Sequence, residues 1–356
     1  MLNRLLFPES ITTFTLLLEM GVAAVIVIIA ATLLAGLCDR LADERGLGRA
    51  FIGMLLLATV TSLPEVVAGA TSGAIGAVDM AFGAVYGSCS FNIVIIVIMN
   101  LVLAGGGSVL SGARPTQLLS SSFGIVMITL SLLAIATVDK FQGHAHVQQG
   151  IEIGMCVAVI ATYMFCMRLI HRFERREAVD LPLDKRIPPN AATIPRIVLV
   201  ALVTIAAAWW LTKTGDVLAE HPIDALGGKP LGKTVVGLCF LAVATSLPEI
   251  AASIASVRMN NLDMALGNVF GSNMFNILVL PVAKLTAFMH GDKLMMSGPG
   301  FSPNLTLLSG LLPVLLTAVA IAGIVYRTQR KVLRLGFDSV LLLLIYVAGM
   351  AAIIVS

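Results

Sequence analysis

ATVTSLPE at residues 58–65 returns as AVATSLPE at residues 242–249, so the chain carries nearly the same motif twice. Both copies continue without a gap into a second shared element, which reads GSCSFN in the first copy and GSNMFN in the second. At a constant offset of 184 positions, residues 47–93 and 231–277 are identical at 22 of 47 positions. The chain therefore contains an internal repeat, and its two copies predict one site shared between two halves of the protein.

The chain around these copies is far more apolar than a soluble domain. Its 356 residues are 58% hydrophobic and 12% charged, with a mean hydropathy of +0.97. Apolar runs of about twenty residues, long enough to cross a bilayer as a helix, recur from end to end. We therefore expect an all-α polytopic membrane protein whose partner is the lipid bilayer. Its basic residues fall in short loops, so no nucleic-acid-binding patch is expected.

Ten membrane spans are predicted, and a polar stretch at residues 171–193 separates the fifth from the sixth. This stretch is charged and proline-rich, which is typical of a linker. The chain then divides into an N-terminal five-helix half at residues 1–170, with its repeat copy at 47–104, and a C-terminal half at residues 194–356, with its copy at 231–289. The predicted spans are 15–37, 50–75, 80–104, 116–138, 149–170, 194–212, 232–257, 264–289, 304–326 and 336–355.

The loop charges predict the orientation of these spans. Of the 23 lysines and arginines, 16 lie in or beside the loops after odd-numbered spans and 7 lie on the opposite side. Because basic loops stay in the cytoplasm, the linker should be cytoplasmic and both termini should lie outside. Each half has an odd number of spans, so the second half enters the membrane from the other side. The sequence thus predicts two inverted repeats, an architecture typical of secondary transporters.

Each copy of the first element places a glutamate directly after a proline within an apolar run. Pro64 and Pro248 lack a backbone N–H and should break the helix. A carboxylate such as Glu65 or Glu249 is costly inside a membrane and marks a functional site by default. Two carboxylates and the freed carbonyls suit a hard divalent cation such as Ca²⁺, which takes about 6–8 oxygen ligands. Nearby hydroxyls that could hold sodium come from Thr61, Ser62, Thr245 and Ser246.

The second element carries a serine and an asparagine four residues apart in each copy. Ser88 with Asn92, and Ser272 with Asn276, therefore share one helix face. The asparagines could line the ion site or form a structural hydrogen bond between helices. No nucleophile–base pair or HExxH motif is present, so the chain is not expected to be an enzyme, and no cofactor is expected.

Two further features have ordinary structural interpretations. Asp79 and Asp263 match between the copies and stand at the starts of predicted spans, where an aspartate is expected to cap the helix. The five cysteines are scattered at no metal-binding spacing and are expected to be small buried hydrophobic residues.

The paired TSLPE and GSxxFN elements resemble those of the calcium/cation antiporter superfamily, specifically its prokaryotic-type sodium/calcium exchanger branch. The resemblance covers both repeats and the ten-span layout. It implies a secondary active antiporter that exchanges Ca²⁺ for Na⁺ by alternating access at a midplane site, in a bacterial inner membrane and without an obligatory protein partner. A proton-coupled antiporter of Ca²⁺ or another divalent cation is the alternative, although that branch tends to carry a GNxxE type of element.

The resemblance also implies roles for individual residues. Calcium would be held by the two glutamates and by the backbone carbonyls of Thr61 and Thr245. Asn92 and Asn276 would line the middle of the site. Sodium would be held by Ser62, Ser88, Ser246 and Ser272, with the carbonyls of Ala58 and Ala242. The first and sixth spans would form a sliding gate.

Three positions differ either between the two copies or from some members of the family. The first copy has Ala84 and Cys89 where the second has Asn268 and Asn273, and we expect altered packing there without loss of the site. Some relatives, including potassium-dependent exchangers, carry an aspartate where this chain has Asn276, which argues against potassium coupling.

Overall fold

The computed structural model describes most of the chain, and the described part is almost entirely helical. Its strands are two antiparallel pairs of two residues each, β1 (Pro222–Ile223) with β2 (Lys229–Pro230) and β3 (Lys331–Val332) with β4 (Leu335–Gly336). The predicted all-α class is confirmed. The structure describes residues 12–103, 108–178, 188–220, 222–223, 229–230, 245–291, 296, 301–327, 331–332 and 335–355.

The helices follow the predicted spans closely. Those before the polar stretch are α2 (Thr13–Arg45), α3 (Arg49–Ile52), the π-helix η1 (Gly53–Leu57), α4 (Ala58–Thr61), α5 (Leu63–Ala74), α6 (Val78–Val102), the 3₁₀-helix η2 (Val109–Gly112), α7 (Pro115–Lys140) and α8 (Ala145–Ala178). Those after it are α9 (Thr193–Glu220), α12 (Leu247–Arg258), α13 (Leu262–Ile277), α14 (Val279–Met289), α15 (Pro303–Tyr326) and α16 (Phe337–Val355).

Eight helices in the described ranges are long and apolar enough to cross a membrane, and a bent pair of helices makes a ninth candidate. The bent pair joins Arg49–Thr61 to Leu63–Ala74 at an angle of 48°. The remaining predicted span, residues 232–257, falls within the described part of the chain only from Thr245 onward. The structure thus describes a polytopic membrane protein with at least eight candidate spans.

Helix α8 is longer than the span predicted at residues 149–170. It continues through residues 171–178, so the first part of the predicted linker is helical. No proline or glycine interrupts the chain between Gly154 and Pro182, and the Glu and Arg residues of this segment are good helix formers. In addition, the buried Glu174 of α8 accepts a hydrogen bond from the Thr116 hydroxyl of α7 at 2.7 Å, which holds this extension against the bundle.

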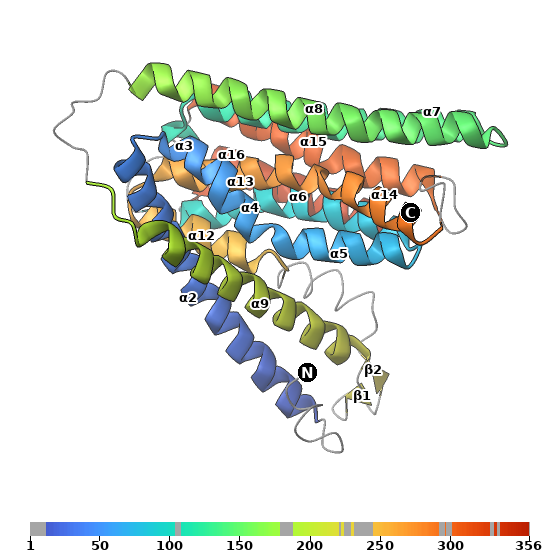
Figure 1. Cartoon of the computed structure of the whole chain (residues 1–356), viewed down its shortest axis with the longest axis horizontal. Coiled ribbons are helices and arrows are strands. Elements are labelled where there is room, and N and C mark those ends of the chain that lie inside the picture. Colours follow the sequence, from blue (N-terminus) through green and yellow to red (C-terminus); the bar gives the residue numbers. More distant parts are fainter. Residues whose placement is uncertain are drawn as a thin grey trace.

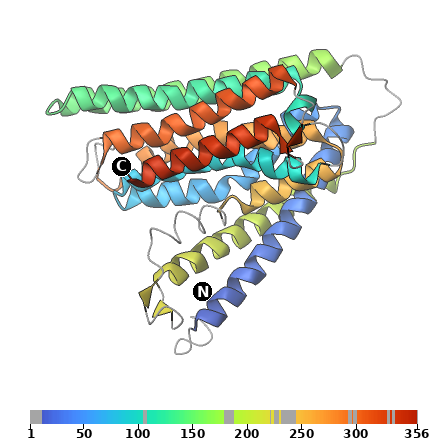
Figure 2. The same ribbon diagram turned by 180° about the vertical axis from the view of Figure 1, so that it is seen from behind.

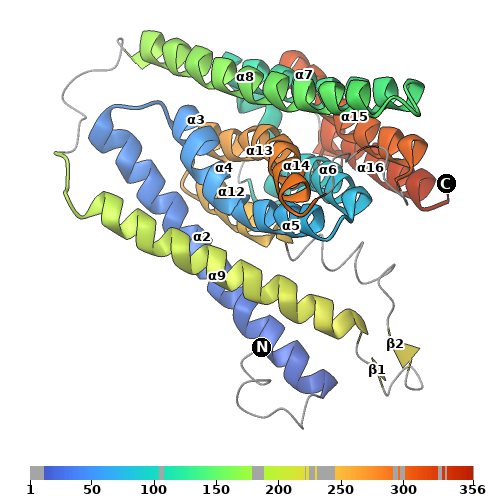
Figure 3. The same ribbon diagram turned by 45° about the vertical axis from the view of Figure 1, so that its right-hand side comes forward.

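The helices form a bundle and a separate pair (Figure 1). Helices α2 and α9 pack along one another and lean away from the rest at their far ends, as Figure 3 also shows. Helices α7 and α8 lie side by side across the opposite face of the bundle, next to α15 (Figure 2). Helix α13 lies at the centre, where it packs against α3, η1, α4, α6, α7 and α12.

Burial separates the central helices from those that face lipid. In the α13–α14 span, 78% of the most apolar 18-residue stretch is buried inside the protein, and in α6 the share is 72%. In α16 it is only 17%. Large hydrophobic side chains such as Leu344 and Val347 of α16 are exposed, as expected for helices in contact with lipid. The two helices that carry the GSxxFN elements are therefore the ones most enclosed by protein.

Candidate ion-binding site

The TSLPE element interrupts the helix in the same way in both copies. Ser62 separates α4 from α5 with φ −93° and ψ 8°, and Ser246 precedes α12 with φ −87° and ψ 5°. The following prolines occupy the first turn of α5 and α12, where a helix does not need their missing N–H. The break therefore comes two residues before each proline, within the four residues over which the proline ring clashes with the preceding helical turn.

The break positions both glutamates in the first turn of a new helix. Glu65 is 5% exposed and Glu249 is 1% exposed. The helix N-terminus supplies a partial positive charge that favours a carboxylate there. The Ser62 hydroxyl of the first copy donates a hydrogen bond to Glu249 Oε1 of the second copy at 2.9 Å. The two halves of the chain thus meet at these carboxylates.

Asn268 of α13 links the elements around Glu249. Its Nδ2 donates to Ser253 Oγ of α12 at 3.0 Å and to the backbone carbonyl of Glu249 at 3.4 Å. Its Oδ1 accepts from the Thr61 hydroxyl of α4 at 3.4 Å. One buried amide therefore holds α4, α12 and α13 together beside the break. The sequence analysis did not assign Asn268 to the site, although its mismatch with Ala84 was a visible signal.

Polar atoms without a hydrogen-bond partner are concentrated in this region. Twelve buried side-chain nitrogen and oxygen atoms in the described part of the chain lack a partner, and ten of them belong to the two repeat copies. A buried polar group costs free energy unless it is paired, so a cluster of such groups indicates room for ions or water. The ten atoms are Glu65 Oε2, Glu249 Oε2, Ser246 Oγ, Ser272 Oγ, and the Oδ1 and Nδ2 atoms of Asn92, Asn273 and Asn276.

The other predicted site residues differ in their surroundings. Ser88 of α6 is buried, and Thr61 is buried with its hydroxyl also 3.3 Å from the carbonyl of Ala58. The Ala58 carbonyl accepts the Ser62 backbone N–H as well, at 3.0 Å. Thr245 is half-buried just before the break, and Ala242 lies outside the described residues. Asn273, by contrast, was not assigned to the site, yet both polar atoms of its buried side chain lack a partner.

Close backbone packing holds α13 against the first copy. A Cβ atom added at Gly267 would come within 2.6 Å of the Ala50 carbonyl, and one at Gly271 within 2.6 Å of the Met54 Cα. Small residues permit this approach between membrane helices. It places the serine and asparagine face of α13 beside the segment that leads into the break. The counterparts of these glycines in α6, Gly83 and Gly87, have no atom within 4 Å of such a Cβ.

A third carboxylate in the bundle has a different environment. Glu152 of α8 is fully buried and forms an ion pair with Lys284 of α14. Its other oxygen accepts the backbone N–H of Met296 at 2.6 Å. No ion pair within the described ranges involves Glu65 or Glu249. Buried charges are paired or bind metal ions, and each of these two carboxylates keeps one oxygen, Oε2, without a hydrogen-bond partner, which leaves both available to a cation.

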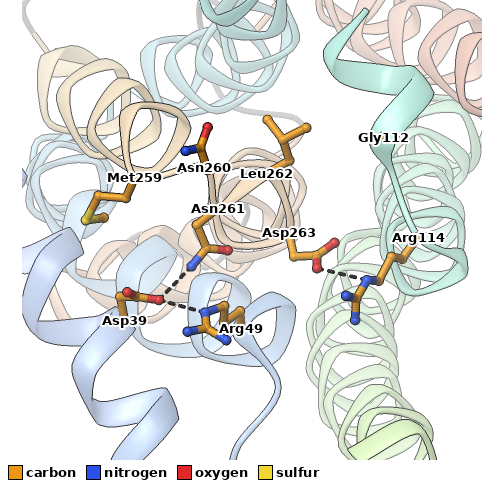
Figure 4. Close-up of a pocket in the computed structure, with 9 residues that line it drawn as sticks. All are labelled: Asp39, Arg49, Gly112, Arg114, Met259, Asn260, Asn261, Leu262 and Asp263. Atoms are coloured by element: carbon orange, nitrogen blue, oxygen red, sulfur yellow. Dashed lines mark hydrogen bonds and ion pairs between the residues drawn. The ribbon is translucent and has the colours of Figure 1, made fainter. Parts of the chain in front are cut away.

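A charged pocket of about 420 Å³ lies at one end of the bundle (Figure 4). Asp39 at the end of α2 pairs with Arg49 of α3 at 2.7 Å and accepts from the Asn261 side chain at 2.7 Å. Arg114 pairs with Asp263 at 3.0 Å. The contacts of Asp39 connect α2 to the bundle. Because both carboxylates already pair with arginines, the pocket is not a cation site.

The residues of this pocket show that the prediction of aspartate caps was wrong. Asn261, rather than Asp263, is the N-cap of α13, and its side chain accepts the Met264 N–H at 3.2 Å. Asp263 lies one residue inside the helix, where it pairs with Arg114. In the first copy α6 begins at Val78 with Ala77 at the cap position, so Asp79 also lies inside its helix. The sequence pattern placed the helix starts correctly to within two residues but chose the wrong cap.

Comparisons with known proteins agree with this architecture. The chain is 27% identical to the putative antiporter CaxA of Alkalimonas amylolytica over 75% of its length and 82% of the relative's. It is 26% identical to the inner membrane protein YrbG of Escherichia coli over 66% of its length and 68% of the relative's. The solved structure of the sodium/calcium exchanger from Methanococcus jannaschii has the same fold, with a TM-score of 0.66 at 17% identity over 96% of this chain and 99% of that one.

The family match covers most of the chain. The family described as sodium/calcium exchanger protein matches residues 15–170 and 194–355, which include all or most of every described candidate membrane span. These two segments leave out residues 171–193, which include the last eight residues of α8, and the chain ends. The protein is therefore an integral membrane antiporter, and the chain belongs to the sodium/calcium exchanger family of cation antiporters.

Proposed function

We propose that this protein is a secondary active antiporter that exchanges Ca²⁺ for Na⁺ at one site between its two repeats. The observation that carries the proposal is the cluster of ten buried polar atoms without partners, contributed by both copies and including both glutamates. A site for a cation must offer oxygens that the protein itself leaves free. This cluster supplies them in the most enclosed part of the bundle.

Calcium is held in this proposal by Glu65 and Glu249. Their two negative charges balance one Ca²⁺, and carboxylates that bind through both oxygens supply four of the 6–8 ligands that calcium takes. The amide oxygens of Asn92 and Asn276 and the backbone carbonyls of Thr61 and Thr245 are available for the rest. This assignment is supported by the burial of both glutamates and by the lack of a described ion pair to either of them.

Sodium binds in the same region through neutral oxygens. The hydroxyls are those of Ser62, Ser88, Ser246 and Ser272, together with the carbonyls of Ala58 and Ala242. A hydroxyl has two acceptor lone pairs and can rotate. The Ser62 hydroxyl can therefore rotate away from Glu249 and coordinate a sodium ion through its oxygen. Sodium and calcium then compete for overlapping groups, which is the requirement for exchange.

Alternating access follows from the two halves acting as inverted repeats. The matching dihedral angles at Ser62 and Ser246 support this. So does the contact between the Cys89 thiol and the Asn273 carbonyl, two residues that are one repeat apart and meet at 3.6 Å. Residues related in this way touch where a pseudo-two-fold axis passes between α6 and α13. Helices α2 and α9, the first helix of each half, are the proposed sliding gate.

The proposed setting is a bacterial inner membrane, with both termini outside and residues 171–193 in the cytoplasm. The 16-to-7 division of basic residues supports this orientation. The chain is proposed to work without an obligatory protein partner and without a cofactor. Residues 1–170 and 194–356 are the two halves of the transporter.

The test is ⁴⁵Ca²⁺ uptake into proteoliposomes loaded with sodium, with sodium and pH gradients imposed separately. We expect Glu65→Gln and Glu249→Gln to abolish uptake, because each keeps the side-chain size but removes one charge from the calcium site. The matched control is Glu174→Gln, which alters a buried glutamate that binds Thr116 and lies outside the cluster. Wild-type uptake by a folded Glu65 or Glu249 variant would refute the site. Uptake driven by a pH gradient alone would assign the protein to proton-coupled exchange.

A further inference from the structure

The side-chain amide of Asn268 on α13 is fully buried, and its hydrogen bonds fix which way it points. Its Nδ2 lies 3.0 Å from Ser253 Oγ and 3.4 Å from the backbone carbonyl of Glu249. A backbone carbonyl only accepts hydrogen bonds, so the amide atom beside Glu249 must be the NH₂ group. The amide oxygen, Oδ1, therefore faces Thr61 as an acceptor.

The Thr61 hydroxyl has one proton and two described acceptors. Its oxygen lies 3.3 Å from the Ala58 carbonyl oxygen and 3.4 Å from Asn268 Oδ1. Both distances are longer than the roughly 2.5–3.0 Å of an ordinary O–H···O hydrogen bond, so the hydroxyl lies between the two acceptors and is held tightly by neither. Rotation about the Cβ–Oγ bond is enough to turn the proton from one acceptor to the other.

The Ala58 carbonyl has room for one further partner. A backbone carbonyl has two lone pairs, and the Ser62 N–H takes one of them at 3.0 Å. The other lone pair can accept the Thr61 proton or coordinate a cation, but it cannot do both at once. This proposed sodium ligand is therefore blocked whenever Thr61 donates to it.

We propose that Asn268 controls sodium binding by accepting the Thr61 proton. When the hydroxyl points to Asn268 Oδ1, the Ala58 carbonyl is free for Na⁺, and when the hydroxyl points to Ala58 that carbonyl is occupied. Asn268 is thus a positioning residue, because it acts on a sodium ligand through Thr61. The inference rests on the proposed function, since it deepens the sodium role assigned there to the Ala58 carbonyl.

The two copies differ at this position. The residue of the first copy that is equivalent to Asn268 is Ala84, whose methyl group accepts no hydrogen bond. Asn268 of the second copy reaches across to Thr61 of the first copy, so the amide acts between the halves of the chain. This control therefore applies to one of the two proposed sodium carbonyls, that of Ala58.

The first experiment obtains the apparent sodium dissociation constant from the rise in melting temperature of the purified protein along a sodium chloride series at constant ionic strength. Asn268→Ala should raise this constant about three- to tenfold, the factor that corresponds to one ordinary hydrogen bond, because the proton is left on Ala58. Thr61→Val keeps the backbone carbonyl but removes the proton. If the proton divides its time equally between the acceptors, this change should lower the constant about twofold.

The double variant separates control of the proton from loss of packing. Without the Thr61 proton there is nothing for Asn268 to accept, so Asn268→Ala combined with Thr61→Val should bind sodium as Thr61→Val does. A sodium loss that persists in the double variant would overturn the inference, as would a wild-type constant in Asn268→Ala. Where Asn268→Ala does not fold, Thr61→Val decides alone, and a constant equal to or above that of the wild type would overturn the inference.

The matched control is Asn100→Ala, which removes another buried amide that links helices. Asn100 Nδ2 donates to Ser339 Oγ at 2.6 Å, and its Oδ1 accepts the Val109 N–H at 2.7 Å. This variant should lower the melting temperature and leave the apparent sodium constant unchanged. A sodium change as large as that of Asn268→Ala would show a general effect of destabilisation and would refute control by Asn268.

Sodium-driven ⁴⁵Ca²⁺ uptake separates this inference from the proposed function. Wild-type protein that shows neither stabilisation by sodium nor sodium-driven uptake would refute the proposed function. Normal uptake by the wild type with an unchanged sodium constant in Asn268→Ala would refute only the role of Asn268. The predicted sodium constants in a protein that moves no calcium would refute exchange and leave control by Asn268 standing.

Discussion

The two matched serines at the helix breaks should respond differently to the same substitution. Ser62 Oγ donates to Glu249 Oε1 at 2.9 Å, whereas Ser246 Oγ is buried without a partner. A hydrogen bond to a charged acceptor contributes about 1.5–3 kcal/mol, so Ser62→Ala should destabilise the ion-free protein by about that amount. Ser246→Ala removes no described hydrogen bond and replaces an unsatisfied polar atom, so it should be neutral or slightly stabilising.

The response to added sodium should instead be the same for both variants. If both hydroxyls bind sodium, each variant loses part of the stabilisation that sodium gives to the folded state, which grows with the ratio of ion concentration to dissociation constant. Loss of one ligand worth about 1.4 kcal/mol would raise the apparent sodium dissociation constant about tenfold. The serines are thus expected to differ in the ion-free protein and to agree in their sodium response.

The assay is thermal unfolding of the purified protein in detergent. Each variant is measured first with chelator and choline chloride and then along a sodium chloride series at constant ionic strength. Ser256→Ala is the control, because Ser256 is fully buried but donates only to a carbonyl of its own helix, Ala252, at 2.9 Å. Equal ion-free shifts for Ser62→Ala and Ser246→Ala would refute the asymmetric contact with Glu249. A sodium response unchanged in both variants would refute their role as sodium ligands.

The remaining predictions concern packing, orientation and coupling. Gly271→Ala places a Cβ 2.6 Å from the Met54 Cα and should destabilise the protein by about 1–3 kcal/mol in thermal unfolding, whereas Gly83→Ala should be tolerated, since nothing lies within 4 Å there. A single cysteine placed in residues 171–193 of a cysteine-free variant should be labelled by impermeant reagents only from the cytoplasmic side; labelling only from outside would reverse the orientation. Two carboxylates balance one Ca²⁺, so each sodium beyond two adds net charge, and flux should then respond to membrane potential by about 2.3 kcal/mol per charge per 100 mV. Voltage-independent flux would indicate two sodium ions per calcium.

Local chemistry explains why the centre of the fold was predictable from the sequence. The restriction that a proline places on its own helix acts within four residues, so the interruption in TSLPE could be located without knowledge of the rest of the chain. The burial of Glu65 and Glu249 followed from the apolar runs around them. The internal repeat then required both to be treated alike, and the structure gives Ser62 and Ser246 almost the same backbone conformation.

Residues whose role depends on a partner helix were not predictable in the same way. Asn268 acts through contacts with Thr61 and Ser253, which lie on two other helices. The choice of Asn261 over Asp263 as the cap depends on Arg114, which competes for the aspartate from a segment about 150 residues away. Such choices are made by tertiary packing, which no local pattern contains.

The packing of α2 fits the proposed sliding gate. Its buried face presents Ala31, Ala35 and Ala42, and the facing side of α12 presents Ala251, Ala252 and Ala255, all in one apolar cluster. Leu34 and Cys38 of α2 belong to the same cluster, but most of the facing side chains are methyl groups, which form a shallow surface and limit the interlocking that opposes a shift of one helix along the other.

Several directional contacts of α2 lie near its C-terminal end. There Asp39 binds Arg49 and Asn261, and Glu44 accepts from the Thr193 hydroxyl at the start of α9. The glutamates of the site, by contrast, lie on α5 and α12, and α13 is fixed to the first copy by contacts at Gly267 and Gly271 that leave no space even for a methyl group. The segments of the proposed ion site are therefore held together by close backbone packing, while α2 packs on α12 mainly through small apolar side chains and has charged contacts near its C-terminal end. Alternating access to a fixed site requires such a difference between a closely packed site and a neighbouring helix that can shift along it.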